Sequence, residues 1–145
     1  MIEIPKYVNK FKDRFPQEYN KIRSECLKTA GCGVHGSLSA WVPDRIFFDF
    51  GPACLNHDIA YVVAATLLRA DDTYGLDSLR MKLEADWCFR ENIRSAVDER
   101  IELMEWPYSI EWVLKKLGYF FSDVYRLGVM NSFGRQAFYD NIWKE

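Results

Sequence analysis

Two long helical patterns joined by a short run of turn residues constrain the fold of this chain more than any other feature. The first opens at Gly51-Pro52, where proline suits the first turn of a helix, and continues to about Arg69 with apolar residues on most sides. Residues 70–75 then supply turn formers and candidate helix N-caps, and the second pattern extends until Pro107 limits it. We therefore expect an antiparallel hairpin of two buried helices.

The segments on either side of the hairpin also favour helices. A first helix is expected from about Pro16 to Gly31, and an amphipathic one from about Ser109 to Met130. Between Gly31 and about Phe50 the periodicity fails, and so long an irregular stretch is uncommon in compact domains unless it binds or gates something. The chain is expected to be mainly α, with residues 1–145 forming one domain and the last helix serving for packing or as a surface anchor.

Length and charge narrow the classes of function. Nineteen basic against 21 acidic side chains give a formal charge of -2, so no chain-wide basic field recommends nucleic acid as a partner. The beginning of the sequence has no signal-peptide pattern, and no segment is apolar for the length of a membrane span. We expect a soluble, cytoplasmic protein by default, and the sequence indicates no obligate protein partner.

Asp86 interrupts the apolar face of the second hairpin helix. Residues at steps of three or four define that face: Leu76, Leu79, Leu83, Asp86, Arg90, Ile93, Val97, Ile101 and Met104. Arg90 also interrupts this face, but the place of Asp86 between Leu83 and Ile93 indicates that its carboxylate points inward. A buried carboxylate needs a partner.

His57 is the partner that the hairpin register predicts. The first hairpin helix carries one row at helical steps: Cys54, His57, Tyr61, Ala64 and Leu68. The sequence midpoint between His57 and Asp86 falls in the turn, so the two lie level in a symmetric antiparallel hairpin. Tyr61, one turn further on, can donate a hydrogen bond to the same carboxylate. Asp58 lies about 100° round the helix from His57 and faces a neighbouring element.

A histidine held by a buried carboxylate is fixed in one tautomer and suited to take a proton from water or a hydroxyl. The alternative is a histidine whose hydrogen bonds are satisfied in the core, without any chemistry. A serine triad has little support, because Ser37 and Ser39 lack the Gly-x-Ser-x-Gly context of an activated nucleophile.

The stretch from Phe48 to Tyr61, with the spacing Cys54-x-x-His57-Asp58-x-x-Tyr61, resembles the active-site helix of the phospholipase A2 family. Phe-Asp-Phe before Ala-Cys looks most similar to the bacterial and fungal branch. Residues 85–89 resemble the second helix, where that family places its catalytic aspartate. The resemblance covers roughly residues 30 to 95 and implies a phospholipase A2-like fold with an extra C-terminal helix.

Residues 31–36 are similar to the calcium loop of the secreted enzymes in that family. The resemblance implies a Ca²⁺ ion held by the side chain of Asp58 and the backbone carbonyls of Gly31, Gly33 and His35, all oxygen ligands that calcium prefers. It also implies that the backbone N–H of Gly33 faces the developing oxyanion.

The activity implied is calcium-dependent hydrolysis of the sn-2 ester of glycerophospholipids at a membrane surface. His57, Asp86 and Tyr61 would be the catalytic residues: His57 would deprotonate the attacking water, and Asp86 would orient His57. A calcium site with few ligands binds weakly, so activity is expected only after release from the cell.

The chain departs from the family pattern in its loop, where His35 replaces the usual glycine and a long insertion follows Gly36. These departures favour an alternative function, an inactive binding or interaction module with a degenerate calcium loop. The insertion also brings in Asp44 as a possible supplementary ligand.

The cysteines leave further alternatives open. The family pattern implies a disulfide between Cys32 and Cys54, whereas the helix register would also allow Cys54 to meet Cys88. Alternatively, Cys54, His57, Asp58 and Cys88 together could suit zinc.

Aromatic side chains could contact lipid or fill the core: Trp41, Phe47, Phe48, Trp106, Tyr108, Trp112, Phe120 and Phe121. Helical positions favour the core for most of them, and the loop position of Trp41 favours membrane contact.

Overall fold

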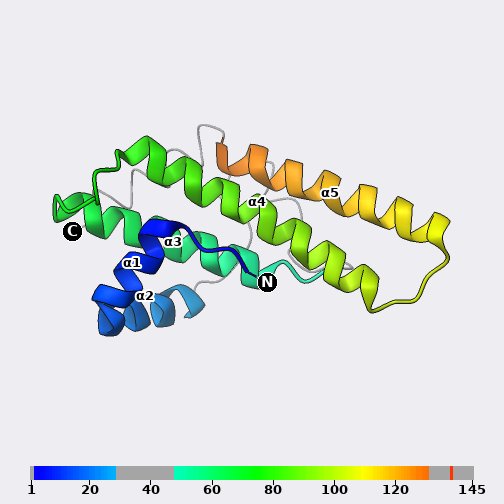
Figure 1. The fold of residues 1–145 in the computed structure, drawn as a ribbon, viewed down its shortest axis with the longest axis horizontal. Helices are drawn as coiled ribbons and strands as arrows, with labels where there is room; N and C mark the ends of the chain where they lie inside the picture. Colours follow the sequence, from blue (N-terminus) through cyan, green and yellow to red (C-terminus); the bar gives the residue numbers. More distant parts are fainter. Residues whose placement is uncertain (1, 29–47, 131–137, 139–145) are drawn as a thin grey trace.

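The computed structural model describes residues 2–28, 48–130 and 138, and this part of the chain is mainly helical. Its five long helices are α1 (Lys6–Arg14), α2 (Pro16–Lys28), α3 (Gly51–Arg69), α4 (Ser78–Glu102) and α5 (Tyr108–Met130). Figure 1 shows α3 and α4 running in opposite directions, with α1 and α2 beside α3 and with α5 along α4. None of the helices in these ranges has the length and apolar character needed to cross a bilayer.

The expected hairpin of α3 and α4 is confirmed. α3 begins at Gly51 with Pro52 in its first turn, ends at Arg69 and buries ten of its side chains, as its apolar pattern predicts. After the turn, the side chain of Asp77 accepts a hydrogen bond from the backbone N–H of Arg80 and caps α4. The cap therefore lies just beyond the residues 70–75 that were expected to supply it.

The predicted inward face of α4 is correct from Asp86 onwards and wrong for the two leucines before it. Ile93, Val97 and Ile101 are buried, whereas Leu79 and Leu83 are 56% and 46% exposed. The first half instead buries Met81, Lys82, Ala85 and Phe89. A straight helix turns relative to a fixed row of residues, and α4 changes its main neighbours along its length, so one row cannot face the core throughout.

The N-terminal segment adds a helix that the sequence reading did not predict. α1 precedes α2 and buries Tyr7, Val8 and Phe11, which have helical spacing. The first residue of α1 is hydrogen-bonded to α4: the backbone N–H of Lys6 donates to Glu84 Oε1 at 2.6 Å. Residue 3 is held by Asn92, whose side-chain amide bonds both its N–H and its carbonyl oxygen, at 2.6 and 2.8 Å.

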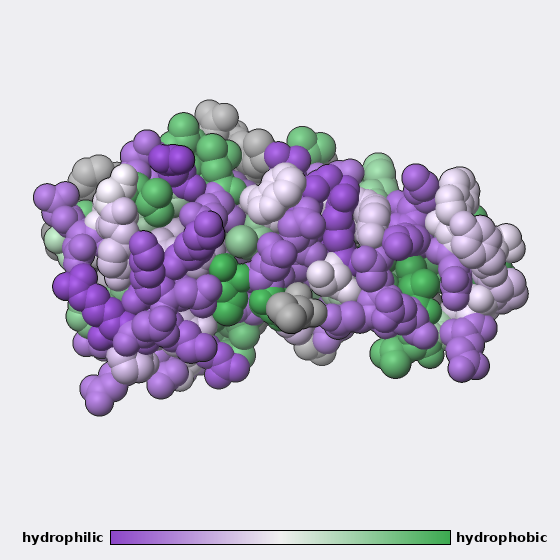
Figure 2. Space-filling view, viewed as in Figure 1, coloured by the Kyte–Doolittle hydropathy of each residue, from purple (hydrophilic) through white to green (hydrophobic). Residues whose placement is uncertain are grey.

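Pro107 begins α5 rather than ending α4, because its carbonyl oxygen accepts from Ile110 and Glu111 while α4 already ends at Glu102. α5 packs on α4 through a close approach at Gly118. The preference for the core among the helical aromatics is wrong for Tyr108, Trp112 and Phe120, which are 82%, 56% and 60% exposed. Figure 2 shows scattered patches of hydrophobic residues, in green, among hydrophilic residues, in purple, on one face of the molecule. Phe48 is buried, and Trp41 and Phe47 lie outside the described residues.

Candidate functional site

The centre of the candidate site is the buried carboxylate of Asp86, which receives hydrogen bonds from both predicted partners on α3. His57 Nε2 lies 2.8 Å from Asp86 Oδ1, and the Tyr61 hydroxyl donates to the same oxygen at 2.6 Å. Asp86 is 2% exposed, and His57 and Tyr61 are also buried. These contacts confirm the inward direction of Asp86 and the register inferred from the turn.

The geometry assigns the proton positions on His57. A carboxylate can only accept, so Nε2 carries the hydrogen and donates it to Asp86. In the neutral imidazole the other ring nitrogen, Nδ1, then has a lone pair and can take a proton. The Phe89 ring lies against the imidazole at a centroid distance of 4.5 Å and the Tyr61 ring at 4.2 Å, so the imidazole is held on more than one side.

Lys82 completes the surroundings of Asp86, and the sequence reading missed it. Its ammonium donates to Asp86 Oδ2 at 2.6 Å, and its side chain is 4% exposed. Lysine is almost never fully buried unless it is paired, so a lysine four residues before an inward-pointing aspartate was the available signal. The predicted apolar face contained Leu83, the residue next to Lys82, and not Lys82 itself.

The charges around Asp86 decide its ionisation. Burial alone would raise the pKa of this carboxyl, but the hydrogen bond and charge of His57, followed by the charge of Lys82, lower the pKa below its ordinary value. Tyr61 shows the opposite effect: burial first, and then the negative charge of Asp86, raises the pKa of its hydroxyl far above the ordinary range. Asp86 is therefore an anion at neutral pH, and Tyr61 is a neutral donor to it.

A distant part of the chain also reaches this site. Phe138 is fully buried, and its ring meets Tyr61 edge-on at a centroid distance of 4.8 Å. Tyr125 of α5 is likewise buried, with its ring 6.1 Å from that of Phe89. No local sequence pattern predicts these two contacts, because they depend on the tertiary packing of segments that are distant in the sequence.

Asp58 directly follows His57 on α3, the helix against which α2 packs. Burial raises the pKa of Cys26 on α2, and the charge of Asp58 adds to this effect. Burial raises the pKa of Asp58 to about 6, although the nearby His57 charge opposes this effect. Within the described part of the chain, Asp58 makes no hydrogen bond or ion pair. A half-buried carboxylate so poorly supplied with donors is suited to a cation.

The other predicted ligands of this cation, Gly31, Gly33 and His35, lie outside the described residues, as does Asp44. No group of three or more His, Cys, Asp or Glu side chains with metal-site geometry occurs among the residues that are described. A site built mainly from backbone carbonyls would need only one such side chain, that of Asp58.

The cysteines remove two of the alternatives. Cys54 is disulfide-bonded and cannot act as a thiolate ligand, so the hypothetical zinc site loses one of its four ligands. Cys88 is a buried free thiol, which excludes its pairing with Cys54. The pairing of Cys54 with Cys32 stays a prediction, because Cys32 lies outside the described residues.

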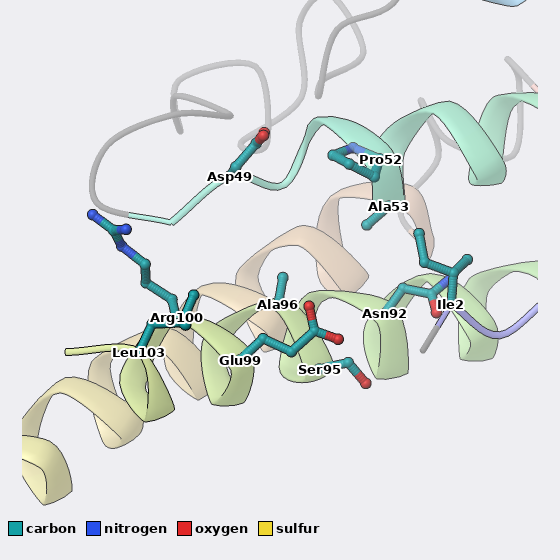
Figure 3. Close-up of a pocket in the computed structure, with 10 residues that line it drawn as sticks. All are labelled: Ile2, Asp49, Pro52, Ala53, Asn92, Ser95, Ala96, Glu99, Arg100 and Leu103. Atoms are coloured by element: carbon teal, nitrogen blue, oxygen red, sulfur yellow. The ribbon is translucent and has the colours of Figure 1, made fainter. Parts of the chain in front are cut away.

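A pocket of about 290 Å³ opens near the start of α3, between that helix and α4 (Figure 3). Pro52 and Ala53 line it from α3, and Asn92, Ala96 and Glu99 from α4. Ala53 lies one turn before His57 on α3. His57, Tyr61, Asp86 and Asp58 are not among the lining residues described, so the pocket adjoins the Asp86 group without including it.

Comparisons of the chain with protein-family models, with curated proteins and with solved structures found no match. The resemblance to phospholipase A2 therefore depends on the spacing of the residues described above, and the geometry of the site has to support any function.

Proposed function

We propose that this protein is a calcium-dependent phospholipase A2-like hydrolase that cleaves the sn-2 ester of glycerophospholipids. The observation that carries the proposal is the buried group of His57, Asp86 and Tyr61, in which one carboxylate oxygen accepts from both other side chains. This is an arrangement that orients a histidine as a general base. It lies on the residues whose spacing resembles the family's active-site helix.

In this proposal His57 takes a proton from water through Nδ1, because Nε2 is committed to Asp86. The water oxygen attacks the ester carbonyl carbon, and the proton then passes from His57 to the leaving alcohol. Asp86 holds the imidazole in one tautomer and stabilises the imidazolium while the proton resides on it. The Tyr61 hydroxyl fixes the position of Asp86 Oδ1 at 2.6 Å.

Asp58 supports the calcium dependence. Its carboxylate is half-buried, has a raised pKa and has no hydrogen-bonding partner within the described residues, so a bound cation would offset its desolvation. Asp58 would hold Ca²⁺ together with the backbone carbonyls predicted for Gly31, Gly33 and His35. When bound, calcium supplies positive charge that polarises the ester carbonyl and stabilises the tetrahedral oxyanion.

Exposed aromatic side chains on α5 support a lipid surface as the place of action. Tyr108, Trp112 and Phe120 reach solvent, and Trp and Tyr are the residues that favour the boundary between water and lipid headgroups. The ammonium of Lys116 lies 5.6 Å from the Trp112 ring centroid, where it could also approach a lipid phosphate. We propose release from the cell as the condition for activity, because a weak calcium site stays empty in cytosol.

Fatty-acid release from mixed phospholipid vesicles tests the proposal, with millimolar calcium or with a chelator. Wild type should release fatty acid only with calcium, and His57→Ala should lower the rate by roughly 10²- to 10⁴-fold. Thr66→Val is the matched control on α3, because its hydroxyl bonds only Val62 O in its own helix at 2.9 Å and should not matter. If wild type released nothing under any condition, the inactive binding module would replace the hydrolase.

A further inference from the structure

The Lys82 ammonium is a charged group at the site to which neither the sequence pattern nor the proposed reaction gives a role. It lies on α4, one turn before Asp86, and both side chains are almost completely buried, at 4% and 2% exposure. Surface lysines that pair at this spacing keep their charge in water, whereas this one has lost most of its hydration. The energetic cost of burying it calls for a reason.

Stability is a poor reason for burying this lysine. A buried ion pair can often be replaced by apolar side chains of similar volume with little loss or even a gain, because removing two charges from water costs more than their attraction returns. The order of the two residues is also the less favourable one for an isolated helix, since the basic residue precedes the acidic one. The local sequence therefore does not explain Lys82.

The hydrogen bonds around Asp86 do explain it. The carboxylate has two oxygens, and the two donors from α3, His57 and Tyr61, both use Oδ1. Among the described residues, Lys82 is the donor to Oδ2, at 2.6 Å, and it belongs to α4 like Asp86 itself. With a donor on each oxygen, the carboxylate cannot rotate without breaking a charge-assisted bond, and Oδ1 stays directed at the imidazole.

The remaining charges near Asp86 do not duplicate this role. Burial raises the pKa of Tyr7 on α1, and the charge of Asp86 adds to this effect. The Tyr7 hydroxyl, however, donates to the carbonyl oxygen of Ala60 at 3.0 Å. Glu84, which also raises the pKa of Tyr7, is negative and accepts from the backbone N–H of Lys6. Lys82 itself is steadied by the Tyr61 ring, whose centroid lies 5.7 Å from Nζ.

We infer that Lys82 is a positioning residue: through its bond to Oδ2 it holds Asp86 as an anion, in the one orientation that serves His57. In this role Lys82 acts on the reaction through Asp86 rather than on the substrate. The kinetic part of this inference rests on the proposed hydrolase activity, whereas the state of the Asp86 carboxyl can be measured without any activity.

The test uses full-length Lys82→Met, which keeps most of the side-chain volume, and Lys82→Gln, which keeps a donor for Oδ2 without the charge. Lys115→Met is the matched control, because Lys115 pairs with Asp98 at 3.4 Å on the surface. The Asp86 carboxyl is followed by ¹³C NMR in aspartate-labelled protein, with Asp86→Asn to assign its signal. Fatty-acid release from vesicles gives kcat and KM for the same proteins.

We expect Lys82→Met to raise the titration midpoint of the Asp86 carboxyl by about 1 to 3 pH units, the usual effect of a neighbouring opposite charge. It should also lower kcat by roughly 10- to 100-fold with little change in KM, as for other groups that orient a histidine through its partner. Lys82→Gln should raise the midpoint similarly but retain more of kcat, and Lys115→Met should change neither.

An unchanged Asp86 midpoint in both Lys82 variants would overturn the inference, as would a raised midpoint with an unchanged kcat. If one variant fails to fold by circular dichroism, the other decides. If wild type has no hydrolase activity, the proposed function fails by itself, and the Asp86 midpoint alone decides whether Lys82 holds the anion.

Discussion

The interface between α3 and α4 and the outer face of α5 depart from the usual distribution of side chains in opposite ways. Between α3 and α4, the polar groups of His57, Lys82 and Asp86 are buried in a core that apolar residues could fill. On α5, in contrast, the apolar side chains of Phe120 and Leu127 are 60% and 64% exposed, at positions where polar side chains would interact better with water. Stability would be served by the reverse arrangement in both places.

The comparison teaches where each region's constraint originates. The members of the buried polar group are joined through the Asp86 carboxylate, so removal of one member takes a hydrogen bond from another. The exposed apolar residues of α5 have no such mutual dependence in the described structure. Substitutions in the first region should therefore be costly and non-additive, whereas those on the outer face of α5 should cost little.

The largest effect on stability is expected for Asp86→Asn. It removes the negative charge that Lys82 meets at 2.6 Å and takes that partner from a buried ammonium, which should lower the free energy of unfolding by about 3 to 5 kcal/mol. Adding Lys82→Met to Asp86→Asn should recover part of this loss, because the stranded charge is then gone. Urea unfolding of the two single variants and the double variant measures the coupling. Additive effects would show that the two charges are not paired.

Tyr61→Phe should have the next largest effect. It removes a hydroxyl that donates to a charged oxygen at 2.6 Å, and such bonds contribute about 1.5 to 3 kcal/mol. Tyr7→Phe is the matched variant, since its buried hydroxyl donates to the neutral carbonyl of Ala60 at 3.0 Å. That bond should contribute only about 0.5 to 1.5 kcal/mol. Equal losses in urea unfolding would contradict the special status of the Asp86 group.

The inner face of α5 should be less tolerant than its outer face. A Cβ added at Gly118 would lie 2.5 Å from both γ-methyl carbons of Val97, which is fully buried. Gly118→Ala should therefore destabilise the protein by about 1 to 3 kcal/mol through overpacking. Combining it with Val97→Ala should cost less than the sum of the two single losses, since the clash is removed. Thermal unfolding of the three variants tests this.

The sequence predicted the parts of this molecule that depend on short-range periodicity. The bounds of α3, the turn and the pairing of His57 with Asp86 follow from helical spacing and from a symmetric turn, and the structure confirms them. α1 was missed although Tyr7, Val8 and Phe11 carry its signal, because its other residues are mainly charged or polar.

The remaining features depend on contacts between distant segments. Leu79 and Leu83 looked like core residues because they continue the row of Asp86, but burial on α4 follows its neighbours rather than one row. Lys82 looked like a surface residue because lysine usually is one. Phe138 gave no signal, since its place against Tyr61 depends on how the chain folds back. The calcium ligands predicted around Asp58 stay a prediction.

The pH dependence of metal-free stability should reveal Asp58. Burial raises its pKa to about 6, above the value of about 3.9 expected for an unfolded chain. The folded state then binds the proton more tightly, so stability is highest below pH 4 from this group and falls as the pH rises through 6. We expect wild type with a chelator to lose about 1 to 2 kcal/mol between pH 4.5 and 7.5 from this group.

Asp58→Asn should flatten that dependence, because asparagine does not titrate. Calcium added at pH 7.5 should stabilise wild type and leave Asp58→Asn unchanged, since ligands that bind only the folded state stabilise it. Urea unfolding at both pH values measures these differences. Identical pH profiles for the two proteins would show that Asp58 is not the titrating group.

The smallest effect is expected on the outer face of α5. Phe120 is 60% exposed, so Phe120→Ser should change the free energy of unfolding by less than about 0.5 kcal/mol. If this face meets lipid, the same variant should lower fatty-acid release from vesicles while hydrolysis of a monomeric short-chain phospholipid stays at the wild-type rate. A loss on both substrates would instead place Phe120 within reach of the reaction, and no loss on either would assign the exposed face of α5 to contacts other than lipid.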